Sequence, residues 1–112
     1  MKSKIVSERQ RQLFKLLENC GELIFAGGHN GINANICGEF HIQGYDDEDR
    51  LEVGDGTHHI HIQWDKVKRF EIGKYNGEGV ITFFDGDTRL FKLYRPEGEF
   101  PENIRKLSGN LV

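Results

Sequence analysis

Three of the five histidines fall within four positions, at His58, His59 and His61. Ile60 and Ile62 alternate with His59 and His61, which is the period of a half-buried strand whose successive side chains point to opposite faces. His59 and His61 would then share a face, with Cα atoms about 6.5–7 Å apart. Two imidazoles at this spacing could hold a metal ion, contact the edge of a cofactor, or simply face water together.

Metal coordination is one chemistry open to this pair, because His-x-His is a known ligand spacing. A cupin-type site needs a Glu four or five residues after the second histidine and a further histidine downstream. Asp65 is the acidic residue at that distance, and no histidine follows His61. A structural zinc site would need two more ligands, from Cys20, Cys37 or a distant histidine. His59 and His61 are therefore candidate metal ligands without a complete ligand set nearby.

No catalytic set accompanies the histidines. The chain has no Gly-x-Ser-x-Gly motif, and neither Cys20 nor Cys37 has a local signature of a nucleophile. The Gly-rich stretch at 27–31 is followed neither by the Lys-Ser/Thr of a phosphate-binding loop nor by a helical pattern. With 18 acidic residues, spacing alone identifies no carboxylate pair. The sequence favours a binding protein over an enzyme.

Length and charge narrow the class of protein further. The 112 residues predict one domain, 1–112. The net charge of −3 and the absence of a basic stripe argue against a nucleic-acid partner. No apolar run is long enough to cross a membrane, and no apolar signal segment is visible at the N-terminus. The two cysteines lack Cys-x-x-Cys spacing and are typical of a reduced, cytoplasmic protein, and a single disulfide between them is the alternative.

The periodicity predicts a small α+β domain. A helix is expected after a cap at Ser3 or Ser7 and should end near Asn19, before Gly21, and a short helix is expected at 101–107. The Asn-Gly pair at 76–77 predicts a hairpin turn. We therefore expect a meandering antiparallel sheet of about seven or eight strands, with a face that two helices cannot fully cover. The expected strands are 22–26, 32–36, 39–44, 51–53, the histidine stretch, 67–72, 80–84 and 89–94.

From about residue 38 to residue 107 the chain resembles the cytosolic haem-utilisation carriers of the HutX/ChuX type, which are related to HemS-like proteins. His59-Ile60-His61-Ile62 with Asp65 is similar to a His-x-His-Leu stretch of that family, although Ile60 stands where the family has Gly. The residues 83–87 and 91–94 resemble its Phe-Phe-Asp turn and Phe-Lys-Val strand. An arginine-containing loop with Arg95 and a short helix then follow.

The resemblance implies a HemS/ChuX-like fold and a haem-binding carrier that forms a homodimer. His59 or His61 would supply the axial nitrogen to haem. Lys68, Arg69 or Arg89, selected for their charge and their proximity in the sequence, would meet the propionates. The sheet would supply aromatic contacts, among them Phe83, Phe91 and Tyr94. One alternative is an interaction module of the same fold that has lost the haem site. The other alternative is an enzyme that degrades haem.

Overall fold

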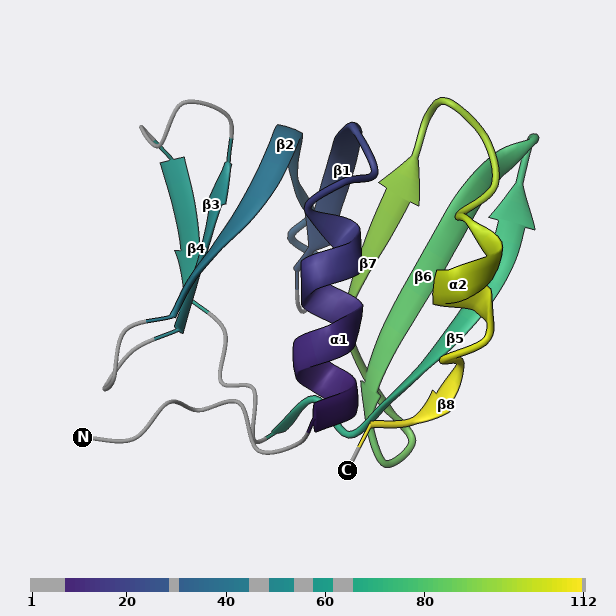
Figure 1. Cartoon of the computed structure of the whole chain (residues 1–112). Coiled ribbons are helices and arrows are strands. Elements are labelled where there is room, and N and C mark those ends of the chain that lie inside the picture. Colours follow the sequence, from purple (N-terminus) through teal and green to yellow (C-terminus); the bar gives the residue numbers. More distant parts are fainter. Residues whose placement is uncertain (1–7, 29–30, 45–48, 54–57, 62–65, 112) are drawn as a thin grey trace.

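A computed structural model of the chain describes residues 8–28, 31–44, 49–53, 58–61 and 66–111, and for 40–44, 49–53 and 58–61 it describes the backbone alone. These residues form two helices and eight strands (Figure 1). The bounds are α1 Glu8–Leu17, β1 Glu22–Gly27, β2 Ala34–Gly44, β3 Asp49–Val53, β4 His58–His61, β5 Arg69–Tyr75, β6 Glu78–Asp85, β7 Thr88–Arg95, α2 Glu102–Arg105 and β8 Gly109–Asn110.

The α+β class with an antiparallel sheet and a helix toward each end is confirmed, but the predicted single meander is not. The strand order is β4-β3-β2-β1-β7-β6-β5-β8. Two meanders, β1 to β4 and β5 to β7, are joined where β1 pairs with β7. Local alternation cannot reveal this long-range pairing, because it depends on packing between distant segments.

One long strand, β2, replaces the two strands expected at 32–36 and 39–44. Its first half, Ala34 to Glu39, pairs with β1, and its second half, Phe40 to Gly44, pairs with β3. Six strands therefore form the main ladder, and β3 and β4 extend the sheet outward from the far half of β2 (Figure 1). The histidine strand β4 is the outermost strand at this end.

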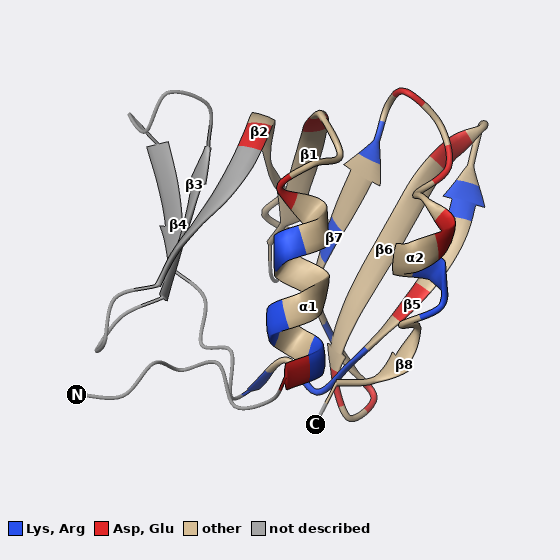
Figure 2. Cartoon of the chain, viewed as in Figure 1, with Lys and Arg blue, Asp and Glu red and all other residues tan. Residues whose placement is uncertain are grey.

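Helix α1 lies across one face of the sheet because its apolar side chains recur at helical spacing (Figure 1). Gly21, with φ of 75°, turns the chain from the helix toward β1, as predicted. The predicted caps Ser3 and Ser7 lie outside the described residues. The charged residues of α1 are exposed, and β6 is uncharged between its ends (Figure 2). The buried residues of α1 are Gln10, Leu13, Phe14 and Leu17.

The core is filled by aromatic side chains between the helices and the sheet. Phe83 is fully buried, and its ring lies 4.4 Å from that of Phe91 and 6.2 Å from that of Phe14, measured between centroids. Gln10 is buried among them, and its Nε2 donates to the carbonyl oxygen of Val67 at 2.7 Å, so its polar group is satisfied. This packing orients one face of the sheet toward α1.

The tight turns agree with the prediction from the sequence more closely than the order of the strands does. Asn76 and Gly77 have φ of 50° and 82°, as the two central residues of a type I′ hairpin turn require. The short C-terminal helix begins after Pro101, which has the extended backbone of a helix-capping position. Strand β8, a two-residue strand paired with β5, was not predicted. None of the described helices is long and apolar enough to cross a membrane.

Candidate functional site

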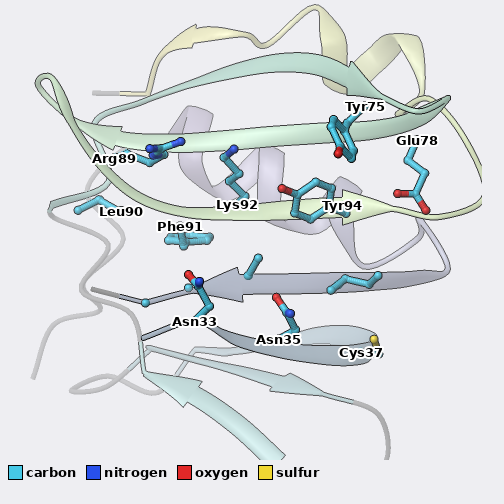
Figure 3. A pocket seen from close by; sticks show the side chains of 14 residues that line it. Asn33, Asn35, Cys37, Tyr75, Glu78, Arg89, Leu90, Phe91, Lys92 and Tyr94 are labelled. Atoms are coloured by element: carbon cyan, nitrogen blue, oxygen red, sulfur yellow. The ribbon is translucent and has the colours of Figure 1, made fainter. Parts of the chain in front are cut away.

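The face of the sheet opposite α1 is hollowed into an open groove of about 770 Å³ (Figure 3). Among the described residues no helix covers this face. The volume falls within the range of small-molecule sites, roughly 300–1,000 Å³. Its lining comes from β1, β2 and β7 and from the β5–β6 turn: Ile24, Ala26, Gly27, Gly28, Asn33, Asn35, Cys37, Tyr75, Glu78, Arg89, Leu90, Phe91, Lys92 and Tyr94.

The floor of the groove is set by the register of three neighbouring strands. Cross-strand partners lie on the same face of a sheet, and successive rows on that face are about 6.5–7 Å apart. One row is therefore polar at both ends and the next is largely apolar. The two rows are Asn35, Ala26 and Lys92, then Cys37, Ile24 and Tyr94.

A β-bulge turns Arg89 toward the groove. Strict alternation from Phe91 and Leu93 would send Arg89 to the core side. The register instead pairs Phe83 with Phe91 and Phe84 with Arg89, so Leu90 has no Cα partner. A bulge of this kind re-aims the side chains beyond it, and Arg89 consequently lines the groove near Lys92 (Figure 3).

The two cysteines lie on opposite sides of the sheet. Cys37 is exposed and lines the groove. Cys20 is buried at the end of α1, where its Sγ lies 3.4 Å from the carbonyl oxygen of Leu16. Burial raises the pKa of the Cys20 thiol, and the nearby charge of Arg95 partly offsets that effect. Both thiols are free, so the groove holds the more accessible one.

The histidines lie on β4, away from the groove. The register pairs His59 with Glu52 and His61 with Arg50 of β3, and Glu52 in turn pairs with His41 of β2. His41 and Arg50 were not selected from the sequence, since only strand pairing brings their positions next to the His-x-His pair. The side chains of His59 and His61 lie outside the described residues, so their metal-ligand role stays a prediction.

The arginine predicted on β5 is engaged in local contacts. The Nη1 atom of Arg69 pairs with the Glu71 carboxylate, and its Nε donates to the carbonyl oxygen of Gly86 at 3.1 Å. Its guanidinium carbon lies 4.0 Å above the centre of the Phe84 ring. Five strands separate β5 from β4 in the sheet order. Arg69 is therefore remote from the histidines along the sheet.

The other predicted contact residues also fall in different places. Phe83 is a core residue with no exposed surface, so it does not line the groove. Arg89, Phe91 and Tyr94 do line the groove, although the groove is formed by strands other than β4. The structure thus divides the predicted residues between the histidine strand, the groove and the core. Among the described residues no three His, Cys, Asp or Glu side chains gather as a metal site.

Comparison with known proteins identifies the fold. No family model matches the chain, and no curated protein matches its sequence. Superposition on solved structures gives an α+β fold of the ChuX type, which confirms the resemblance to the HutX/ChuX family at the level of the fold.

Three solved structures show this similarity of fold. ChuX superposes with a TM-score of 0.61 at 13% sequence identity, covering 95% of this chain and 72% of ChuX. A structure of the haem-binding protein ChuX gives 0.62 at 12% identity, covering 94% of this chain and 72% of the other. A protein of Erwinia carotovora gives 0.62 at 15% identity, covering 96% and 74%. At these identities the comparison establishes a shared fold.

Proposed function

We propose that this chain binds haem and carries it in the cytoplasm for the use of haem iron. The observation that supports this proposal is a His-x-His pair on a strand of a ChuX-type fold. One of the similar structures is a haem-binding protein. A carrier has to hold the porphyrin and release it, and this requires no acid, base or nucleophile of its own.

The residue types on β4 and β3 fit an iron porphyrin. Imidazole nitrogen is a common protein ligand of haem iron, and β4 offers it at His59 and His61. Arg50 occupies the register position opposite His61, which places a residue able to pair with a propionate on the neighbouring strand. Bound haem would supply an iron centre that takes an axial ligand, and the protein's part is to provide that ligand and a partner for the carboxylates.

Replacing both His59 and His61 by alanine is expected to abolish the Soret shift of bound hemin and to weaken its affinity at least about tenfold, because axial coordination is lost. Absorbance titration of the purified wild-type chain and the variant with hemin measures both quantities. His58→Ala is the matched control, since His58 is on the same strand at the alternate position. It should bind as the wild type does.

An unchanged Soret shift in the double variant would contradict coordination by these histidines. A wild-type chain that gives no saturable shift would point to an interaction module of the same fold without a haem site. Loss of porphyrin absorbance when the haem complex is incubated with a reductant would identify a haem-degrading enzyme instead of a carrier.

We also propose that the chain forms a homodimer. Strand β4 ends the sheet order, and within the described residues no strand pairs with its outer edge. An edge strand of this kind presents unpaired backbone groups on which a second chain can pair. Sedimentation equilibrium should give twice the 12.9 kDa mass of one chain. A mass equal to one chain across the concentration range would rule the dimer out.

A further inference from the structure

We propose that the haem-free chain binds a divalent transition-metal ion on one face of strands β2, β3 and β4, with Glu52 of β3 completing the ligand set of the His-x-His pair. This metal site needs no porphyrin, so it does not rest on the proposed haem binding. The observation that supports it is the register of the three strands, because residues 40–44, 49–53 and 58–61 are described by their backbone.

Two neighbouring rows of cross-strand partners hold the polar residues of this part of the sheet. Cross-strand partners share a face of a sheet, and so do residues two apart on one strand. All six positions of the two rows therefore lie on one face. The first row is His41, Glu52 and His59, and the second row is Gln43, Arg50 and His61.

The row between these two rows is apolar. Ile42 pairs with Leu51, and Leu51 pairs with Ile60, so this row lies on the other face of the sheet. The polar face brings together three of the five histidines of the chain and a carboxylate from the strand between them. Strand pairing thus supplies the further ligand types that no residue near the His-x-His pair in the sequence provides.

The spacing of these positions suits one ion. Cross-strand partners have Cα atoms about 4.5–5.5 Å apart, and diagonal neighbours on the same face are about 7–8 Å apart. Glu52 is the direct neighbour of His41 and of His59, and it is the diagonal neighbour of His61. Two histidines and one carboxylate are an established ligand set for zinc and for non-haem iron. Residues at positions this close can supply such a set.

The residue types also select the class of ion and its place. Imidazole favours Zn²⁺, Fe²⁺, Ni²⁺ or Cu²⁺ over the harder Mg²⁺ and Ca²⁺, which prefer oxygen ligands. Arg50 is the partner of His61 in the second row, and its positive charge opposes a cation nearby. The first row, centred on Glu52, is therefore the more favourable place for the ion.

The test is a zinc titration of the full haem-free chain, without a polyhistidine tag, in competition with a chromophoric chelator. We expect one Zn²⁺ per chain and an affinity at least about tenfold weaker in Glu52→Gln, because a charged ligand is lost. Glu71→Gln is the matched control, since it removes the same charge from β5, which four strands separate from β3. It should bind zinc as the wild type does.

A second pair of variants tests the strand register itself. His41→Ala should weaken zinc binding at least about tenfold, although His41 is 18 positions from His59 in the sequence. His58→Ala is its control, because His58 is next to His59 on β4 but lies at the alternate position. It should leave the zinc affinity unchanged. A thermal melt of the metal-free protein checks that each variant is folded.

The results that would overturn the metal site differ from those that would overturn haem binding. No saturable zinc binding by the wild type, or wild-type affinity in both Glu52→Gln and His41→Ala, would overturn the metal site. Arg50→Ala should weaken hemin binding through the lost propionate partner but should not weaken zinc binding. A flat hemin titration together with saturable zinc binding would remove the haem proposal and support the metal site.

Discussion

Replacing Phe83 by alanine is expected to destabilise the fold by about 3–5 kcal/mol, which is the cost of emptying a fully buried phenylalanine site. The ring has no exposed surface and lies within 4.4 Å of Phe91 and 6.0 Å of Phe70, between centroids. Its neighbours come from both α1 and the sheet, so they cannot collapse into the space easily. Chemical denaturation of the purified variant measures the loss.

Phe84→Ala is the matched control for this core position. Phe84 has the same side chain one residue later on β6, but it lies on the opposite face and is only half-buried. Its ring packs against the Arg69 guanidinium, whose carbon lies 4.0 Å from the ring centroid. Its removal should cost about 0.5–1 kcal/mol for the cation–π contact, together with a modest loss of apolar burial. Equal destabilisation by the two substitutions would contradict the assignment of Phe83 to the core.

Gly79→Ala is expected to destabilise the chain by about 1–3 kcal/mol through overpacking. A Cβ atom at Gly79 would lie 2.9 Å from both the carbonyl oxygen of Gly98 and the backbone nitrogen of Phe100. These are backbone atoms, and Gly79 N already donates to that oxygen of Gly98 at 3.0 Å. The loop after β7 would have to shift and would displace the buried Phe100 ring. Thermal and denaturant unfolding measure the effect.

Gly73→Ala provides the matched control on the neighbouring strand. Gly73 of β5 pairs with Val80 of β6, and a Cβ atom at Gly73 would meet no other atom within 4 Å. Because alanine has less backbone freedom than glycine in the unfolded chain, this variant should be at least as stable as the wild type. A loss at Gly73 as large as the loss at Gly79 would refute the close-approach explanation.

Local features of the fold could be predicted from the sequence. The apolar run at 80–84 and the Asn-Gly pair at 76–77 depend only on neighbouring residues, and the structure places a strand and a hairpin turn there. The pairing of β1 with β7 could not be predicted, because it joins residues 64 to 70 positions apart through shared packing on α1. Strand β8 is too short for any alternation to appear.

The candidate sites were harder to predict, because the positions of their side chains also depend on packing between distant segments. Phe83 was expected to contact a ligand because it is aromatic and matched a family motif, but the side of the sheet that it faces depends on how β6 packs under α1. Arg89 was selected for its charge, whereas alternation alone would have placed it on the core side. The bulge at Leu90 decides its direction. Lys92 and Asn35 become neighbours only through β1.

The most direct test of the central claim is a hemin titration of the wild-type chain followed in the Soret band. Haem binding predicts a saturable shift at one haem per chain or per dimer, with a Soret position that changes when His59 and His61 are both replaced by alanine. A titration that stays flat up to a large excess of hemin would contradict haem binding and would leave a ChuX-type fold whose ligand is not haem.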